Sequence, residues 1–135
     1  MNKWFGWLIA GYCGGIFWLS SGPAPTPKSL QFFNSDKLIH AAVYGLLAWL
    51  VCEGLYRSGR AWSRRALWLI PIGFTCLYGA SDEIHQFFVP TRSCDPFDWL
   101  ADSLGALLAV ALWQGIYRSF RKPSTKMEPF TEPQG

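Results

Sequence analysis

The sequence predicts an all-α membrane protein, a bundle of four transmembrane helices with both termini in the cytoplasm. Half of the 135 residues are hydrophobic and only 16% are charged, whereas soluble domains carry about 25% charged residues. The charged residues gather in a few short segments, and the windows between them are long and apolar, as in proteins with several membrane spans. Lysine and arginine are concentrated in the termini and in every second loop, and such a bias sets the orientation of a protein in a membrane.

The first expected span covers residues 4–20. As a helix it would be about 25 Å long, near the short limit for crossing a bilayer core. A signal peptide could have the same length. Gly11 and Gly15 have the spacing of small residues in packed membrane helices, which favours a span that is retained. Three closely spaced prolines between residues 23 and 27 then exclude a helix and predict a loop.

The second expected span covers residues 38–56. Asp36, His40 and Tyr44 recur at helical spacing near its start. A carboxylate, an imidazole and a phenol therefore share one helix face and can point at the same neighbour.

The third expected span covers residues 66–88 and follows a loop rich in arginine. Pro71 is early enough in this segment to be tolerated if the helix starts near it. Its last turns carry the polar sequence SDEIHQFF. On a helix, Glu83 and Gln86 share one stripe, while Asp82 lies on a second stripe about 100° away. The two groups need not face the same partner.

The fourth expected span covers residues 96–117. Asp95 is suited to cap this helix, and the proline that follows it is suited to the first turn. Asp98 and Asp102 share a face with Gly105. This spacing predicts two carboxylates above a surface of small residues that packs against another helix.

The basic residues predict the orientation. If both termini and the arginine loop share a side, that side carries nine lysines and arginines, and the other side carries three. Cytoplasmic loops are enriched in these residues. We therefore expect residues 1–120 to form a multi-pass domain in a bacterial plasma (inner) membrane, and residues 121–135 to form a disordered cytoplasmic tail. The polar segment from residue 78 to residue 105 then faces outward.

Two other classes of protein find little support in the sequence. The net charge of +3 comes with no recognition helix or motif that mixes aromatic and basic residues, so we expect no nucleic-acid partner. The four cysteines lack the close spacing of a zinc motif.

Two segments resemble a known family. They are DKLIHAAVYGLLAWL, residues 36–50, and SDEIHQFFVPTRSCDPFDWLADSLGALLA, residues 81–109. Their Asp-x-x-x-His, Glu-x-x-Gln, Arg and downstream pair of Asp resemble the VanZ-like family of small bacterial integral membrane proteins. The resemblance implies an association with the cell envelope and with tolerance of the glycopeptide teicoplanin, and it implies no particular reaction. Thr91 and Asp102 depart from the family, which often has Gly and Asn there; the second change adds a negative charge.

The polar segment is where a functional site is expected. Ionisable groups at membrane depth cost several kcal/mol unless they are paired or hydrated, so their presence points to a function. Side chains from three different spans should meet at one level near the outer surface. The candidates for catalysis are His40, Glu83, Arg92 and Asp98; those for ligand binding are Asp36, Tyr44, Gln86 and Asp102; and those for binding a divalent cation are Glu83, Asp98 and Asp102.

Three classes of function fit these residues. In an enzyme, His40 would be a general base or a metal ligand, the carboxylates would hold a hard cation, and Arg92 would bind a phosphate or carboxylate. In a binding protein, the same residues would hold a lipid-linked envelope precursor, with membrane lipids around it. In a structural protein, the cluster would only lock the bundle, with Arg92 neutralising Asp98 or Asp102. No motif for a serine nucleophile, a phosphate loop or a His-Glu-x-x-His zinc site selects a reaction.

Overall fold

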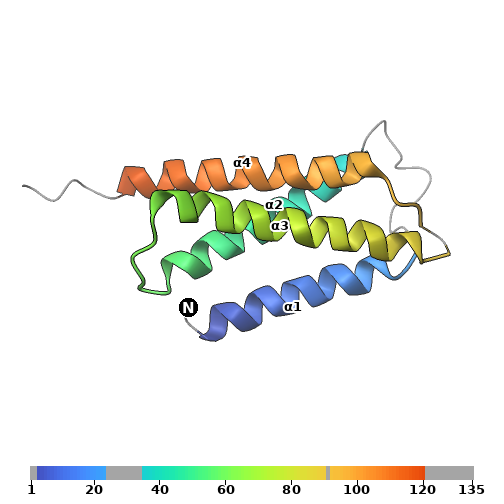
Figure 1. Cartoon of the computed structure of the whole chain (residues 1–135), viewed down its shortest axis with the longest axis horizontal. Helices are drawn as coiled ribbons and strands as arrows, with labels where there is room; N and C mark the ends of the chain where they lie inside the picture. The colour runs from blue at the N-terminus through green and yellow to red at the C-terminus, as the bar shows by residue number, and fades with distance from the viewer. Residues whose placement is uncertain (1–2, 24–34, 91, 121–135) are drawn as a thin grey trace, which may run out of the picture.

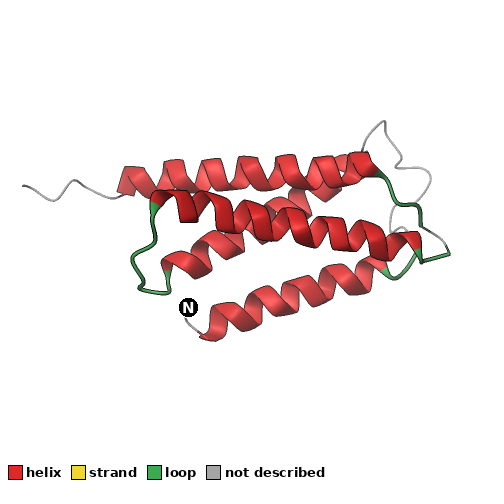
Figure 2. Cartoon of the chain, viewed as in Figure 1, coloured by secondary structure: helices red, strands yellow, loops and turns green. Residues whose placement is uncertain are grey.

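The computed structural model describes residues 3–23, 35–90 and 92–120, and these form four α-helices (Figure 1). The helices are α1 Lys3–Ser20, α2 Ser35–Tyr56, α3 Arg64–Phe87 and α4 Pro96–Phe120. The described ranges contain no strand (Figure 2). The expected all-helical fold is confirmed for this part of the chain. Residues 121–135, expected to be a disordered tail, lie outside the described residues.

Successive helices run in opposite directions (Figure 1). The start of α1, the connection between α2 and α3, and the end of α4 lie at one end of the bundle; the end of α1, the start of α2 and the end of α3 lie at the opposite end. The most extensive contact is between α2 and α4; α3 packs against both, and α1 lies against α2 and α3. The arginine-rich loop is therefore at the opposite end of the bundle from the polar residues that end α3 and begin α4.

Two of the four helices are long and apolar enough to cross a membrane. They are the segments Asp36–Tyr56 of α2 and Pro96–Tyr117 of α4. α1 and α3 do not meet the combined requirement of length and hydropathy, and for α3 one cause is the polar sequence in its last turns. The presence of four spans therefore stays a prediction.

Glycines set the distance between α2 and α4. A Cβ atom on Gly105 of α4 would overlap the backbone carbonyl of Ala41 on α2, and one on Gly45 would lie 3.1 Å from the carbonyl oxygen of Gly105. The two backbones can approach this closely only because these side chains are missing. The predicted packing role of Gly105 is confirmed. Further along the same contact lie the buried residues Ala48, Cys52, Ala106, Val110 and Trp113.

Pro71 lies within α3 and not near its start, so the condition under which a first-turn position would make it tolerable is not met. The helix begins at Arg64, so the proline is buried inside it. A proline has no N–H to donate to the carbonyl four residues earlier, which here belongs to Leu67. Gln114 of α4 supplies the missing donor, because its Nε2 lies 3.3 Å from the Leu67 oxygen. A side chain from a neighbouring helix thus allows α3 to continue through its proline.

Candidate functional site

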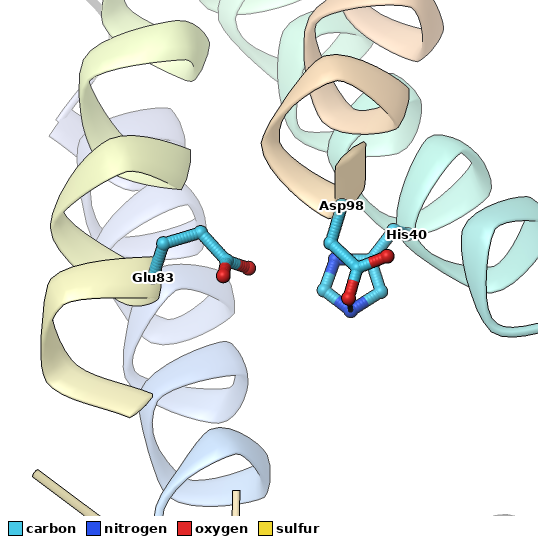
Figure 3. Close-up of side chains that lie close together, drawn as sticks. All are labelled: His40, Glu83 and Asp98. Atoms are coloured by element: carbon cyan, nitrogen blue, oxygen red, sulfur yellow. Dashed lines mark ion pairs between the residues drawn. The ribbon is translucent and has the colours of Figure 1, made fainter. Parts of the chain in front are cut away.

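Side chains from three helices meet at the polar end of the bundle. His40 is on α2, Glu83 is in the last turns of α3, and Asp98 is in the first turn of α4. One side-chain nitrogen or oxygen atom from each lies within 4.8 Å of the others. Figure 3 shows the Glu83 carboxylate directed across the space between helices toward the other two side chains. The antiparallel order of the helices brings these three parts of the chain to one level.

Asp102 of α4 contacts the Nδ1 side of the His40 ring. Its Oδ1 lies 3.0 Å from Nδ1 of His40, and the residue has an exposed fraction of 0%. Its other oxygen, Oδ2, is buried and has no hydrogen-bond partner. A Cβ on Gly79 of α3 would lie 2.9 Å from that oxygen, so the glycine makes room for it. On the opposite side of the imidazole, Nε2 lies 3.9 Å from Oδ2 of Asp98. We call His40, Glu83, Asp98, Asp102 and Lys37, which is described below, the polar cluster.

Glu83 is held at one oxygen and unpaired at the other. Its Oε2 accepts a hydrogen bond from the backbone N–H of Asp95 at 2.9 Å. Its Oε1 is buried without a partner, although the residue has an exposed fraction of only 4%. A buried polar atom that lacks a hydrogen bond costs about 1–3 kcal/mol, and more when it is charged. Such an atom calls for a functional explanation.

Lys37 of α2 joins two carboxylates of the loop and α4. Its Nζ donates to Oδ2 of Asp95 at 2.9 Å and to Oδ1 of Asp98 at 2.7 Å. Asp95 also caps α4, as predicted, because its Oδ1 accepts from the N–H of Phe97 at 2.9 Å. The hydrogen bond from Lys37, followed by the one from Phe97, lowers the pKa of the Asp95 carboxyl below its ordinary value. The carboxylate of Asp95 is therefore ionised at neutral pH.

The sequence did not lead us to include Lys37 in the site. A signal was present, because a cation in the first turn of a helix opposes the helix dipole and loses about 0.3–1 kcal/mol there. A lysine at such a position suggests a carboxylate partner from elsewhere in the chain. In the orientation argument Lys37 is one of the three basic residues on the outer side.

Tyr44 and Gln86, two expected binding residues, contact Asp82. The Tyr44 hydroxyl donates to Oδ2 of Asp82 at 2.9 Å, and Nε2 of Gln86 donates to the same oxygen at 3.0 Å. The Tyr44 ring also stacks on His40, with ring centroids 6.2 Å apart. As predicted, Asp82 and Glu83 face different partners. Gln86, which shares a helix stripe with Glu83, instead bonds to Asp82. This group is buried and hydrogen-bonded, and it borders the polar cluster.

Arg92 bonds to the end of α1 and not to Asp98 or Asp102, the two carboxylates that it would neutralise in a purely structural cluster. Its Nε donates to the carbonyl of Gly22 at 2.9 Å, and its Nη2 donates to the carbonyl of Leu19 at 3.0 Å. Both acceptors are at the C-terminal end of α1, where helix carbonyls lack partners within the helix. Arg92 therefore holds α1 to the loop that precedes α4.

Asp36 and His85 also lie outside the polar cluster. The Asp36 side chain has an exposed fraction of 59%, and its carboxylate lies 4.0 Å from Nζ of Lys37. His85 contacts α1, with Nε2 3.0 Å from Oγ of Ser21 and its ring 4.5 Å from that of Phe17. The structure thus brings together His40, Glu83, Asp98 and Asp102 from the expected set and leaves out Asp36 and Arg92.

Comparison with known proteins identifies one family. The sequence model of VanZ/LLP1 matches residues 9–118, which is most of the chain and includes all of the polar cluster. No curated protein and no solved structure gave a significant match.

Proposed function

Because the chain belongs to the VanZ/LLP1 family, we propose that it binds or modifies a phosphorylated or lipid-linked component of the cell envelope at its polar cluster, in an outward-facing pocket. Family membership and the two apolar helices make it a VanZ-like, envelope-associated membrane protein. The proposal adds a multi-pass topology in the bacterial plasma membrane, a ligand, and a contribution to teicoplanin tolerance.

The distribution of buried and exposed side chains supports α3 as a membrane span, although its mean hydropathy is too low to identify it as one. The buried residues of α3 are Pro71, Thr75, Gly79, Asp82, Glu83 and Gln86, which are polar or small. Large apolar side chains are exposed on the same helix, among them Leu69, Leu77 and Phe87. In a bilayer, apolar side chains can face the lipid without being buried in the protein, whereas polar groups face the interior of the bundle. This helix has the distribution expected of a span.

The arginine loop supports an outward-facing polar cluster. Arg57, Arg60, Arg64 and Arg65 lie at or beside the connection between α2 and α3, at the opposite end of the bundle from the polar cluster (Figure 1). Positively charged loops stay in the cytoplasm. The polar cluster would then lie near the outer surface, where lipid-linked envelope precursors present their head groups.

One observation carries the proposal. Glu83 and Asp102, on different helices, each present a buried carboxylate oxygen without a hydrogen-bond partner. A cluster that served only to lock the bundle would pair these oxygens, as Tyr44 and Gln86 pair Asp82. Unpaired oxygens weaken the folded protein, and they suit a cluster that completes its bonding with a ligand.

Replacing Glu83 by Gln tests the proposal, because the amide keeps the shape and the acceptor for the Asp95 N–H but removes the charge. We expect a folded protein that no longer raises teicoplanin tolerance in cells that depend on it. Glu53→Gln is the matched control, since Glu53 pairs with Arg57 at the opposite end of the bundle. The measurements are expression, thermal stability in detergent and teicoplanin tolerance.

A structural role is the alternative, and the fully bonded Asp82 favours it for that residue. Under a purely structural role, Glu83→Gln and Glu53→Gln would both support tolerance at the wild-type level. That result, in a stable Glu83→Gln protein, would exclude the polar cluster as the functional site.

A further inference from the structure

We infer that the polar cluster holds one divalent transition-metal ion, with His40 Nε2, Glu83 Oε1 and Asp98 Oδ2 as its protein ligands. The inference rests on the proposed function and deepens it, because the ion would be the group to which a phosphate of the envelope component binds. Asp102 and Lys37 would orient the ligands without touching the ion.

The distances between the three side chains fit an ion better than direct bonds. Nε2 of His40 and Oδ2 of Asp98 are 3.9 Å apart, which is too long for a hydrogen bond. Two metal–ligand bonds of about 2.1 Å span at most about 4.2 Å, and in a tetrahedral site they place the two ligand atoms about 3.4 Å apart, so a small approach of these two side chains would let an ion bridge them. One ligand atom from each of the three side chains lies within 4.8 Å of the other two. A small rotation of the Glu83 side chain would therefore complete the set.

The contact between His40 and Asp102 leaves Nε2 of the imidazole as the nitrogen that a metal would use. The carboxylate of Asp102 can only accept a hydrogen bond, so the 3.0 Å contact requires the proton on Nδ1 of His40. The lone pair of a neutral imidazole then lies on Nε2, which faces Asp98. Histidine ligands of metals commonly donate their other N–H to a carboxylate, which fixes the ring and raises its basicity.

The two carboxylate ligands each have one oxygen engaged and one available. Glu83 accepts from the Asp95 N–H through Oε2, and its Oε1 is buried without a partner. Asp98 accepts from Lys37 through Oδ1, and its Oδ2 faces His40. Neither carboxylate has to give up a hydrogen bond in order to bind the ion.

The charge balance also calls for a cation. Glu83, Asp98 and Asp102 lie together with Asp95 nearby, and among the described lysines and arginines only Lys37 pairs with any of them. Arg92, which could have balanced them, bonds to α1. Helix dipoles do not remove the excess, because two N-termini and two C-termini meet at this end of an antiparallel four-helix bundle (Figure 1). A negatively charged head group would be repelled unless a cation is bound first.

The donor set selects the kind of ion. One imidazole nitrogen and two carboxylate oxygens suit Zn²⁺ or Mn²⁺, whereas Mg²⁺ and Ca²⁺ prefer oxygen alone. Three protein ligands leave at least one coordination position open. A phosphate oxygen of the envelope component would occupy it, beside the Lys37 ammonium.

Metal content of the purified protein tests the inference. The full chain, prepared in detergent without a histidine tag and stripped with a chelator, would be dialysed against Zn²⁺, Mn²⁺ or Mg²⁺. We expect about one equivalent of Zn²⁺ or Mn²⁺ to be retained, and no Mg²⁺. His40→Ala, Glu83→Gln and Asp98→Asn should each reduce retention at least tenfold.

His85→Ala is the matched control, because His85 is the only other histidine of the chain and lies against α1. It should bind as much metal as the wild type. Helical content and thermal unfolding identify any variant that fails to fold. Titration of the wild type with Co²⁺ needs no variant, and we expect a visible absorption band that saturates at one equivalent.

The outcomes separate the metal from the proposed function. Less than a tenth of an equivalent of Zn²⁺ and of Mn²⁺ in the folded wild type would overturn the inference, as would unchanged retention in folded His40→Ala and Glu83→Gln. If Glu83→Gln loses teicoplanin tolerance while the wild type binds no metal, the proposed function stands and the ion is refuted. If the wild type binds metal and Glu83→Gln keeps full tolerance, the ion stands and the proposed function is refuted.

Discussion

Nδ1 of His40 and Oδ1 of Asp102 lie 3.0 Å apart, joining α2 to α4 through a carboxylate whose second oxygen has no hydrogen-bond partner. An asparagine at position 102 could still accept from the imidazole and would remove a buried charge. We therefore expect Asp102→Asn to stabilise the metal-free protein by on the order of 1–2 kcal/mol. The same change should weaken metal binding about 10–100-fold, because the imidazole loses its anionic partner.

Denaturation of the chelator-stripped proteins and metal titration would measure both effects. A lower stability of metal-free Asp102→Asn would mean that the carboxylate already has a favourable partner in the folded protein, such as an ordered water molecule.

Gly105 should tolerate no side chain. The Cβ of an alanine would overlap the Ala41 carbonyl, and both backbones would have to move apart. We expect Gly105→Ala to destabilise the protein by about 3 kcal/mol, the upper end of the usual cost of overpacking. Gly73 of α3 is the control, because a Cβ there meets nothing within 4 Å. Gly73→Ala should leave stability unchanged or raise it by up to about 1 kcal/mol. Equal effects of the two substitutions on the unfolding midpoint would contradict the close approach of α2 and α4.

The sequence was sufficient to predict the helices and the convergence of the main site residues. The capping residue Asp95 and the proline after it mark the start of α4, and alternation of direction places His40, Glu83 and Asp98 at one level. These features depend on capping residues within a few positions of each helix end and on the alternating direction of successive helices.

The partners of long side chains could not be predicted in the same way. Arg92 bonds to the carbonyls of Leu19 and Gly22 at the C-terminal end of α1 and not to the carboxylates of α4. Lys37 spans from α2 to Asp95 and Asp98, which are about 60 residues away in the chain. Such contacts depend on distances between helices, which the spacing of residues within one helix does not determine. The tolerance of Pro71 in the interior of α3 could not be predicted for the same reason, since the hydrogen-bond donor that compensates for the proline belongs to α4.

The contact between Gln114 and Leu67 should depend on Pro71. Gln114→Leu removes the donor to a carbonyl that the proline leaves unpaired, which we expect to cost about 1–2 kcal/mol. In a Pro71→Ala background the alanine N–H can bond to Leu67, so the same change should cost less than about 0.5 kcal/mol. A double-mutant cycle of unfolding free energies measures the difference. Additive costs would show that Gln114 does not compensate for the proline.

Arg92→Ala should loosen α1 and leave the polar cluster intact. The substitution removes two hydrogen bonds, one to the carbonyl of Leu19 in the last turn of α1 and one to the carbonyl of Gly22 just after the helix. We expect hydrogen exchange in the C-terminal half of α1 to become at least several-fold faster, with metal retention unchanged. Arg60→Ala, in the loop at the opposite end of the bundle, is the control. Loss of metal without faster exchange in α1 would mean that Arg92 acts on the polar cluster.

Cys94 should be the only cysteine that reacts with an impermeant maleimide from outside the cell. It is exposed in the loop before α4, whereas Cys13, Cys52 and Cys76 are within helices and wholly or partly buried; all four are free thiols. Labelling of intact cells, with access through any outer membrane provided, would measure this. Cys94→Ser is the control and should abolish labelling. Labelling only after the plasma membrane is opened would place the polar cluster in the cytoplasm.

Gly79 contributes no side-chain atom, yet the second oxygen of Asp102 occupies the space that even a methyl group there would fill. A chain that carries every charged residue of the polar cluster but a larger residue at this position would have to move that carboxylate. Descent of the site could therefore be followed through other sequences by the pattern Gly-x-x-Asp-Glu-x-x-Gln, residues 79–86 here. Within this pattern the glycine should be the most discriminating position, because alanine, its nearest substitute, already brings a Cβ to 2.9 Å from the Asp102 oxygen.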